Sequence, residues 1–239
     1  MAIKAVVWDI DDTIFDYTGA DTEGLRRTLD DEGLPHGYLS AEDALRRWRE
    51  LTDRHWARFA AGAVDFQGQR RDRVRDFLGR VLSDAEADAW FGRHVAHYEA
   101  AWSLFPDFLP AFDRLSGTHR HAVLSNSSIH NQDRKLRALG VRELFEAVIC
   151  AAELGVSKPE AAAFLAACDA LGLPPRDVAY VGDHPDVDAR GAAEAGLTGI
   201  WLDRSGRGGR PELLRIAALG ELPGLLGVDT RFGAPSTFG

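Results

Sequence analysis

Short apolar runs that end at an acid, a serine or a cysteine recur along this chain, and they limit the folds it can adopt. Five such runs are present, at Ala5–Asp9, His121–Ser125, Phe145–Cys150, Val178–Asp183 and Thr198–Asp203. A short apolar run without alternation is typical of a strand that is buried on both faces. Segments of helical character separate the later runs, at 129–139, 159–171 and 186–195. Strands that alternate with helices in this way predict an α/β fold with a doubly wound parallel sheet.

Residues that favour helix starts and stops support these helices. Gly140, Gly172 and Gly196 each follow the end of one helical segment, where glycine is favoured because it adopts the left-handed conformation. Pro159 stands at the expected first position of another helix, where its missing N–H has no partner to lose.

The interval from 17 to 102 contains no convincing strand run, and its periodicity is helical. Ser40 opens an S-x-x-D pattern and Ser83 an S-x-x-E pattern, so two capped amphipathic helices are predicted. Gly62 and Gly68 are expected to mark a turn within this interval. We therefore predict an inserted α-helical cap domain at 17–102 and a core formed by 1–16 with 103–239.

The composition narrows the partners and the compartment. The chain has 239 residues, 45% of them hydrophobic, which indicates a globular protein. Its formal net charge of −9 argues against binding to nucleic acid or to an anionic membrane, because like charges repel. No apolar run reaches the roughly 18 residues of a membrane span, and the first residues lack a signal-peptide pattern, so a cytoplasmic protein is expected. Cys150 and Cys168 lack metal-ligand spacing and are expected to be buried. Both a monomer and a homodimer fit this composition.

Acidic residues follow the first predicted strand in the pattern Asp9-x-Asp11-x-Thr13. The carboxyl ends of the strands in a doubly wound sheet form its binding crevice, so these acids are expected where ligands bind. Crowded carboxylates repel one another unless a cation or a proton neutralises them, and oxygen ligands of this kind suit Mg²⁺. An acidic turn that caps the following segment is the alternative explanation.

Ser125 and Asn126 close the second predicted strand and precede a helix. A hydroxyl, an amide and the free N–H groups of a helix start can hold a phosphate dianion, and a plain helix N-cap is the alternative. Lys158 precedes the helix that Pro159 is expected to start. Its ammonium would keep a carboxylate nucleophile ionised and offset charge on a transferred phosphoryl group, although a lone lysine is usually a surface residue.

Asp183 and Asp188 follow the fourth predicted strand, after Gly182. The glycine would let the backbone turn at the strand end, and the acids would complete a metal site; a strand-to-helix turn with an aspartate cap is the alternative. All four motifs lie at the exits of separate predicted strands, and this coincidence indicates one shared site.

Taken in order, D-x-D-x-T, a strand ending in Ser, Lys-Pro and G-D-x-x-x-x-D, the motifs resemble those of the haloacid dehalogenase superfamily from Ile3 to about Asp203. The resemblance implies a Rossmann-like core and a helical cap of the first type, whose movement closes the site. It implies that Asp9 is the nucleophile, that Asp11 is the general acid and base, and that Ser125 and Lys158 are the phosphate-binding pair, to which the cradle described above adds Asn126. Mg²⁺ would be bound by Asp9, the backbone carbonyl of Asp11 and Asp183, with Thr13 and Asp188 as supporting residues.

Asp11 separates the reactions of this superfamily. Dehalogenases lack an acid two residues after the nucleophile, because a halide leaves without a proton, and phosphonatases also replace it. Asp11 therefore favours a Mg²⁺-dependent phosphohydrolase that acts on a small phosphomonoester through an aspartyl-phosphate intermediate. A phosphomutase, which keeps this acid, and a non-catalytic regulatory protein on the same scaffold stay open. A phosphoacceptor signalling domain fits poorly, because it has no large insert after its first strand.

Two details resemble the branch that contains pyrimidine nucleotidases and acylneuraminate-9-phosphatases. Asp12 replaces the glycine often found at that position, and Asp188 follows Asp183 by five positions. The resemblance implies a nucleotide or sugar phosphate as substrate, with the cap selecting among them. The candidate specificity residues in the cap are Trp48, His55, Trp56, Gln67, Arg70, Arg71 and Tyr98.

Overall fold

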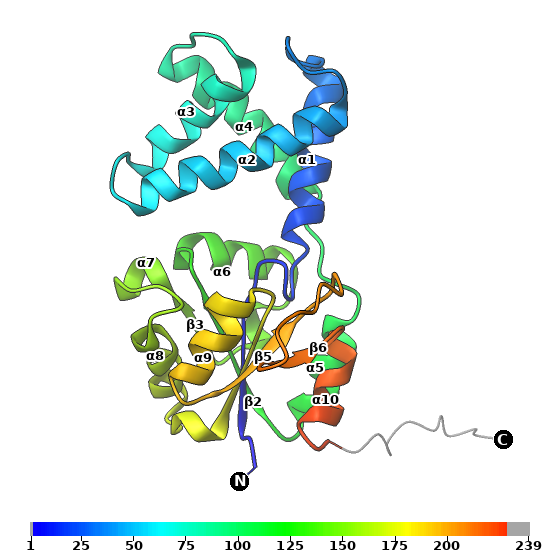
Figure 1. The fold of residues 1–239 in the computed structure, drawn as a ribbon, viewed down its shortest axis with the longest axis vertical. Helices are drawn as coiled ribbons and strands as arrows, with labels where there is room; N and C mark the ends of the chain where they lie inside the picture. Colours follow the sequence, from blue (N-terminus) through cyan, green and yellow to red (C-terminus); the bar gives the residue numbers. More distant parts are fainter. Residues whose placement is uncertain (1, 229–239) are drawn as a thin grey trace, which may run out of the picture. The chain divides into compact units, whose positions relative to one another are not determined.

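The computed structural model describes residues 2–228 and divides the chain into two compact units. One, the core unit, is formed by Met1–Asp16 with Ser103–Gly239, and the other, the helical unit, by Tyr17–Trp102. Figure 1 shows both units along the chain. Residues 229–239, which the predicted core includes, lie outside the described residues.

Six parallel strands form the sheet of the core unit, in the order β3-β2-β1-β4-β5-β6. They are β1 (Ala5–Trp8), β2 (Arg120–Ser125), β3 (Ala147–Cys150), β4 (Val178–Gly182), β5 (Thr198–Leu202) and β6 (Leu214–Ile216). The predicted doubly wound α/β fold is confirmed, and each of the five predicted strands is present. β6 has no counterpart among them, because it has three residues, two of them exposed, and so gives no apolar run.

Helices and short helical turns connect these strands. The α-helices of the core unit are α5 (Phe108–Ser116), α6 (Ile129–Ala138), α7 (Ala151–Leu154), α8 (Ala161–Leu171), α9 (Gly191–Glu194) and α10 (Leu222–Leu225). Turns of 3-10 helix lie at η1 (Arg142–Leu144), η2 (Pro175–Asp177) and η4 (Leu219–Glu221), and a π-helical turn, η3, spans Pro185–Arg190.

Two predicted helices differ from those observed. Glu160 is extended and stands at the N-cap position, so α8 begins at Ala161 rather than at Pro159. The segment predicted as one helix at 186–195 is divided into η3 and α9, because the Gly191 N–H donates to the carbonyl of Asp186, one residue further back than in an α-helix.

Different helices cover the two faces of the sheet (Figure 1). On one face, Val7 and Tyr180 belong to an apolar cluster with Phe164 of α8. On the other face, Trp8 packs edge-on against Phe108 of α5, with ring centroids 5.5 Å apart. Successive side chains of β1 therefore point into two apolar layers, which explains why its sequence is apolar without alternation.

The helical unit consists of α1 (Tyr17–Glu32), α2 (Ala41–Ala60), α3 (Phe66–Leu78) and α4 (Asp84–Ala100). The two predicted caps are confirmed: Ser40 accepts from the Asp43 N–H at 3.2 Å, and Ser83 forms a capping box with Glu86. Gly62 lies in the turn after α2, as predicted, with φ 69°. The prediction for Gly68 is wrong, because α3 begins at Phe66 after its cap residue Asp65 and contains this glycine.

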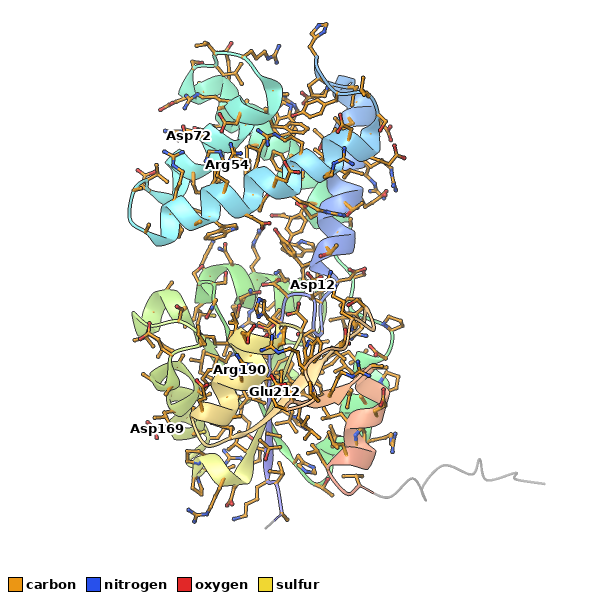
Figure 2. The ribbon with its side chains drawn as sticks, in the orientation of Figure 1. Asp12, Arg54, Asp72, Asp169, Arg190 and Glu212 are labelled. Carbon is orange, nitrogen blue, oxygen red and sulfur yellow. The ribbon has the colours of Figure 1, made fainter. Side chains whose placement is uncertain are left out.

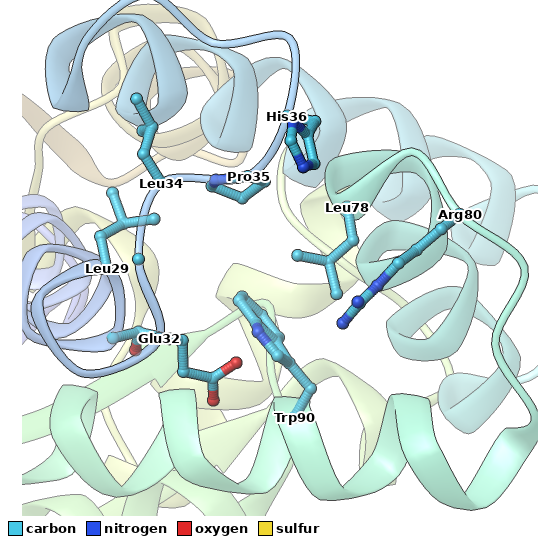
Figure 3. Close-up of a pocket in the computed structure, with 10 residues that line it drawn as sticks. Leu29, Glu32, Leu34, Pro35, His36, Leu78, Arg80 and Trp90 are labelled. Atoms are coloured by element: carbon cyan, nitrogen blue, oxygen red, sulfur yellow. The ribbon is translucent and has the colours of Figure 1, made fainter.

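The helical unit has an apolar core of its own. Trp48 is fully buried at its centre and contacts the ring of Phe77, with centroids 5.1 Å apart. Arg73 lies over the same indole at 4.6 Å. A pocket of about 240 Å³ in this unit is lined by residues such as Leu34 and Trp90 (Figure 3), and none of its lining residues belongs to the predicted motifs.

Cys150 and Cys168 are buried free thiols, as predicted. Among residues 2–228, no helix is both long and apolar enough to cross a bilayer.

Gly199 in β5 has no room for a side chain. A Cβ there would lie 2.0 Å from the carbonyl oxygen of Ala189, whereas one at Gly220 would meet nothing within 4 Å. We expect Gly199→Ala to lower the free energy of unfolding by about 3 kcal/mol, because the obstructing atom is backbone and cannot rotate away. The matched control Gly220→Ala should change it by less than about 0.5 kcal/mol. Urea unfolding measures both, and equal stabilities would contradict the close approach.

Candidate active site

Three neighbouring strands bring the motif residues to one edge of the sheet. β1 lies between β2 and β4, and all three run in the same direction, so their carboxyl ends meet. Ser125 closes β2, while Asp9 and Asp183 follow β1 and β4. The Asp9 N–H donates to the Val181 carbonyl at 2.9 Å, which extends the strand pairing to the first acid. Ligands bind at this position in doubly wound sheets, because the strand order reverses there.

The carboxylate of Asp9 is buried and held at both oxygens. Its Oδ1 accepts a hydrogen bond from Lys158 Nζ at 2.6 Å, and its Oδ2 accepts one from the Thr13 hydroxyl at 3.1 Å. The side chain is therefore fixed in one orientation and paired with a cation, as a carboxylate nucleophile requires.

Lys158 lies at the centre of the site. Besides Asp9, its Nζ donates to Asp188 Oδ1 at 2.7 Å and to the Tyr180 hydroxyl at 2.8 Å. Burial disfavours the ammonium, but the carboxylates of Asp188 and Asp9 outweigh it and raise the pKa of Lys158. The lysine is therefore held as an ammonium, which offsets part of the buried negative charge.

Asn126 holds the main chain of Lys158. Its amide nitrogen donates to the Lys158 carbonyl oxygen at 2.9 Å, and its amide oxygen accepts from the Lys158 N–H at 2.8 Å. Both ends of the amide are used in this way. These contacts position Lys158, and the predicted contact between the Asn126 side chain and a substrate phosphate stays a prediction.

Carboxylate oxygens of Asp9, Asp183 and Asp188 lie within 4.8 Å of one another, a grouping that could hold a metal ion. Burial, followed by the charges of Asp9 and Asp188, raises the pKa of Asp183. Burial also raises the pKa of Asp9, and Lys158 only partly opposes this. The acids thus carry more negative charge than one ammonium neutralises, and their hard oxygen donors suit a divalent cation.

Asp188 is engaged by protein groups at both oxygens. Its Oδ1 also accepts from the Tyr180 hydroxyl at 3.0 Å, and its Oδ2 accepts from the His184 N–H at 3.0 Å. These contacts favour a supporting role for Asp188. A Cβ on Gly182 would lie 2.4 Å from Asp188 Cγ, so this glycine makes room for the carboxylate. The predicted reason for Gly182, a backbone turn, is corrected to this close approach.

A tight turn after β1 brings Thr13 back to Asp9. The N–H groups of Ile14 and Phe15 donate to the Ile10 carbonyl at 3.1 and 3.0 Å. Asp12, labelled in this turn in Figure 2, has φ 57°. Aspartate tolerates the left-handed region better than most side chains, which explains how it replaces the glycine often found at this position.

Asp11 contacts α6 through two residues that the sequence analysis did not identify. Lys135 Nζ pairs with Asp11 Oδ1, and Gln132 Nε2 donates to Asp11 Oδ2 at 2.8 Å. The same Gln132 nitrogen donates to the Ser125 hydroxyl at 3.0 Å. One amide group therefore joins the predicted acid-base residue to the predicted phosphate-binding serine.

The sequence does contain signals for these residues. Gln132 and Lys135 are three positions apart in the predicted helix 129–139 and therefore share a helix face. Tyr180 places a hydroxyl inside an apolar strand run, and a buried hydroxyl needs a partner. Neither pattern identifies the partner, because each partner comes from a distant part of the chain.

Two N–H groups at the start of α6 have protein partners. The Ile129 N–H donates to both oxygens of Glu153, at 3.1 and 3.0 Å, and the Ser128 hydroxyl accepts from the Asn131 N–H at 3.4 Å. These two N–H groups are therefore used within the protein, and the predicted binding of a phosphate at the remaining N–H groups of this segment stays a prediction. The hydroxyl of Ser125 is joined to Asp11 through the amide nitrogen of Gln132.

Several candidate specificity residues have structural partners inside the helical unit. Trp48 is fully buried in its core. His55 pairs with Asp76 at 3.0 Å, and Arg71 pairs with Asp84 at 2.7 Å. Packing and ion pairs within the unit therefore explain these three side chains.

Comparisons with known proteins identify the family and relatives of this chain. The family model described as haloacid dehalogenase-like hydrolase matches residues 3–196. The glyceraldehyde 3-phosphate phosphatase of Methanopyrus kandleri is 29% identical over 211 residues, which cover 84% of this chain and 84% of that protein. The phosphoserine phosphatase of Thermus thermophilus is 28% identical over 243 residues, which cover 92% of this chain and 96% of that protein.

The fold also matches a solved structure, that of the HAD-hydrolase YfnB from Bacillus subtilis bound to magnesium. The TM-score is 0.77 at 21% identity, over 95% of this chain and 100% of that chain. At this identity the likeness shows the fold alone. The family model, in contrast, matches most of the sequence, including the segments that carry Asp9, Ser125, Lys158 and Asp183. The chain therefore belongs to the haloacid dehalogenase-like hydrolases.

Proposed function

We propose that this protein is a Mg²⁺-dependent phosphohydrolase that cleaves small phosphomonoesters through an aspartyl-phosphate intermediate. The arrangement at Asp9 carries the proposal: a buried carboxylate is held by Lys158 at 2.6 Å and by Thr13 at 3.1 Å, beside a second acid, Asp183. Asp11 adds a proton donor that phosphate esters need and halides do not. Two relatives named as phosphatases give further support.

In the first proposed half-reaction, a carboxylate oxygen of Asp9 attacks phosphorus and forms the aspartyl phosphate. The bond between phosphorus and the ester oxygen breaks, and that oxygen takes the proton of Asp11 as the alcohol leaves. Lys158 and the hydroxyl of Ser125 hold the phosphoryl oxygens, and Thr13 keeps Asp9 aligned for attack.

In the second half-reaction, the ionised Asp11 takes a proton from water, whose oxygen attacks phosphorus and releases Asp9 and inorganic phosphate. The same carboxyl group can serve twice because it reaches the solvent side of the site. The Asp11 side chain is 34% exposed, whereas that of Asp9 is 8% exposed.

Asp9, Asp183 and the backbone carbonyl of Asp11 are the proposed ligands of Mg²⁺, supported by Asp188 and Thr13. When bound, the ion supplies positive charge that lowers the repulsion between an anionic nucleophile and an anionic ester. The raised pKa values of Asp9 and Asp183 support a cation site, because burial penalises both carboxylates.

The proposed substrates are small phosphorylated metabolites, such as nucleotide or sugar phosphates. The relatives' names refer to glyceraldehyde 3-phosphate and phosphoserine, which are also small phosphomonoesters. We propose that the helical unit is the cap that selects the alcohol part of the substrate. Measuring phosphate release from a panel of phosphomonoesters would identify the substrate. The same assay would distinguish a phosphatase from a phosphomutase, because a phosphomutase keeps the phosphoryl group on the sugar and releases no phosphate.

Asp9→Asn is expected to abolish phosphate release, because an amide cannot act as the nucleophile. With Mg²⁺ and p-nitrophenyl phosphate, kcat should fall by roughly 10⁴-fold or more, the scale of losing a covalent nucleophile. The matched control is Asp169→Asn, an exposed carboxylate on α8 that is labelled in Figure 2. Its kcat should equal that of the parent. Equal turnover by parent and Asp9→Asn would refute the assignment of the nucleophile, and a parent inactive on every phosphomonoester tested would refute the phosphohydrolase.

Asp183→Asn is expected to raise stability without metal and to remove the response to Mg²⁺. In the metal-free protein the amide eliminates a buried charge beside Asp9, so the Tm should rise. Mg²⁺ at about 100 times its Kd should stabilise the parent by about 2.7 kcal/mol and the variant far less.

Thermal unfolding after EDTA treatment, with and without added Mg²⁺, measures these effects, and Asp169→Asn should behave like the parent. A parent whose Tm is unchanged by Mg²⁺ would contradict the metal site.

A further inference from the structure

We propose that Lys135 and Gln132 of α6 are positioning residues that fix the carboxyl group of Asp11 for proton transfer and tie it to Ser125. The inference rests on the proposed function, since it assumes that Asp11 exchanges a proton with the substrate. It concerns residues outside the four motifs that led to the site.

Lys135 supplies a cation to Asp11 that is separate from Lys158. Its side chain is 7% exposed, and its Nζ pairs with Asp11 Oδ1. The same ammonium lies 4.2 Å from the centroid of the Phe15 ring, at the end of the turn that contains Asp11. A buried ammonium needs compensation, and here the carboxylate and the aromatic ring of one turn provide it. Lys135 therefore holds both the side chain and the turn of Asp11.

The orientation of the Gln132 amide is set by its partner. A carboxylate only accepts hydrogen bonds, so the nitrogen of the amide, and not the oxygen, faces Asp11 Oδ2 at 2.8 Å. The second hydrogen of this nitrogen reaches the Ser125 hydroxyl at 3.0 Å. A shift of Gln132 would thus move the proton-transfer group and the proposed phosphate-binding hydroxyl together.

α6 is well suited to carry such a clamp. Its first turn is fixed by Ser128 and by Glu153, as described above, and Gln132 and Lys135 follow on one face of the helix. Each oxygen of Asp11 accepts one hydrogen bond and keeps a second lone pair. A proton can therefore pass from Asp11 to the ester oxygen, and later from water to Asp11, while both contacts are kept.

A comparison of two leaving groups tests the clamp. The value of kcat/KM covers the steps up to loss of the alcohol, which needs a proton when the alcohol is an alkanol but hardly any help when it is p-nitrophenol. For an alkyl phosphomonoester that the parent hydrolyses, Lys135→Met should lower kcat/KM by about 10- to 100-fold, the scale of a small misplacement. For p-nitrophenyl phosphate the loss should stay below about 3-fold.

The double variant Asp11→Asn/Lys135→Met should be no slower than Asp11→Asn alone, because residues that act through one group are not additive. Gln132→Met should show the same leaving-group pattern. Arg137→Met is the matched control, since it removes an exposed cation of α6 whose partners are Asp133 and Glu143. It should leave both substrates unaffected.

Several outcomes would overturn the inference. Equal losses on both substrates at an unchanged Tm, or losses that multiply in the double variant, would show that Lys135 does not act through Asp11. If Lys135→Met is unfolded at the assay temperature, Lys135→Arg, which keeps the cation, takes its place. It should keep most of the activity on the alkyl phosphomonoester, in contrast to Gln132→Met. A folded Lys135→Arg variant that loses as much of this activity as Gln132→Met would overturn the inference. If Asp11→Asn itself shows no leaving-group difference, the proposed role of Asp11 fails, and the clamp with it.

Discussion

The contacts of Lys158 Nζ with the carboxylates of Asp9 and Asp188, at 2.6 and 2.7 Å, are the interaction on which the rest of the site depends. Both acids are buried, and without the ammonium two uncompensated charges would lie in the protein interior, at a cost of several kcal/mol. Burial, together with the repulsion between neighbouring acids, raises the pKa values of Asp9 and Asp183. One lysine does not neutralise three acids, so the site fits a divalent cation. Positioning the lysine is therefore the main demand on the fold.

Residues at the strand exits position Lys158 and the carboxylates that it contacts. Asn126 fixes the main chain of Lys158 from the exit of β2, with two hydrogen bonds to one residue. Gly182 leaves room for the carboxylate of Asp188 at the exit of β4. The turn after β1 places the hydroxyl of Thr13 on Asp9 and requires a left-handed residue, Asp12. These requirements come from separate strand exits, so the parallel sheet is what brings them to one place.

The two acids of the first motif have different surroundings, and this suits the different roles proposed for them. Asp9 is buried against Lys158 and Thr13, which favours a fixed nucleophile. Asp11 is more exposed and is held from the side of α6 by Lys135 and Gln132. Residues two positions apart after a strand thus meet separate cations from separate segments of the chain, and the local sequence of the motif alone does not provide either one.

The sequence by itself determined the fold class, five of the six strands, both helix caps of the insert and the set of acids around Asp9, because these depend on local patterns of apolar, capping and charged residues. It did not indicate that Asn126 contacts Lys158 or that Gly182 makes room for Asp188. Lys135, Gln132 and Tyr180 became part of the site only in the tertiary structure. Their partners are distant in sequence, up to 124 positions for Lys135 and Asp11, and a local pattern shows that a buried polar group needs a partner without showing which one.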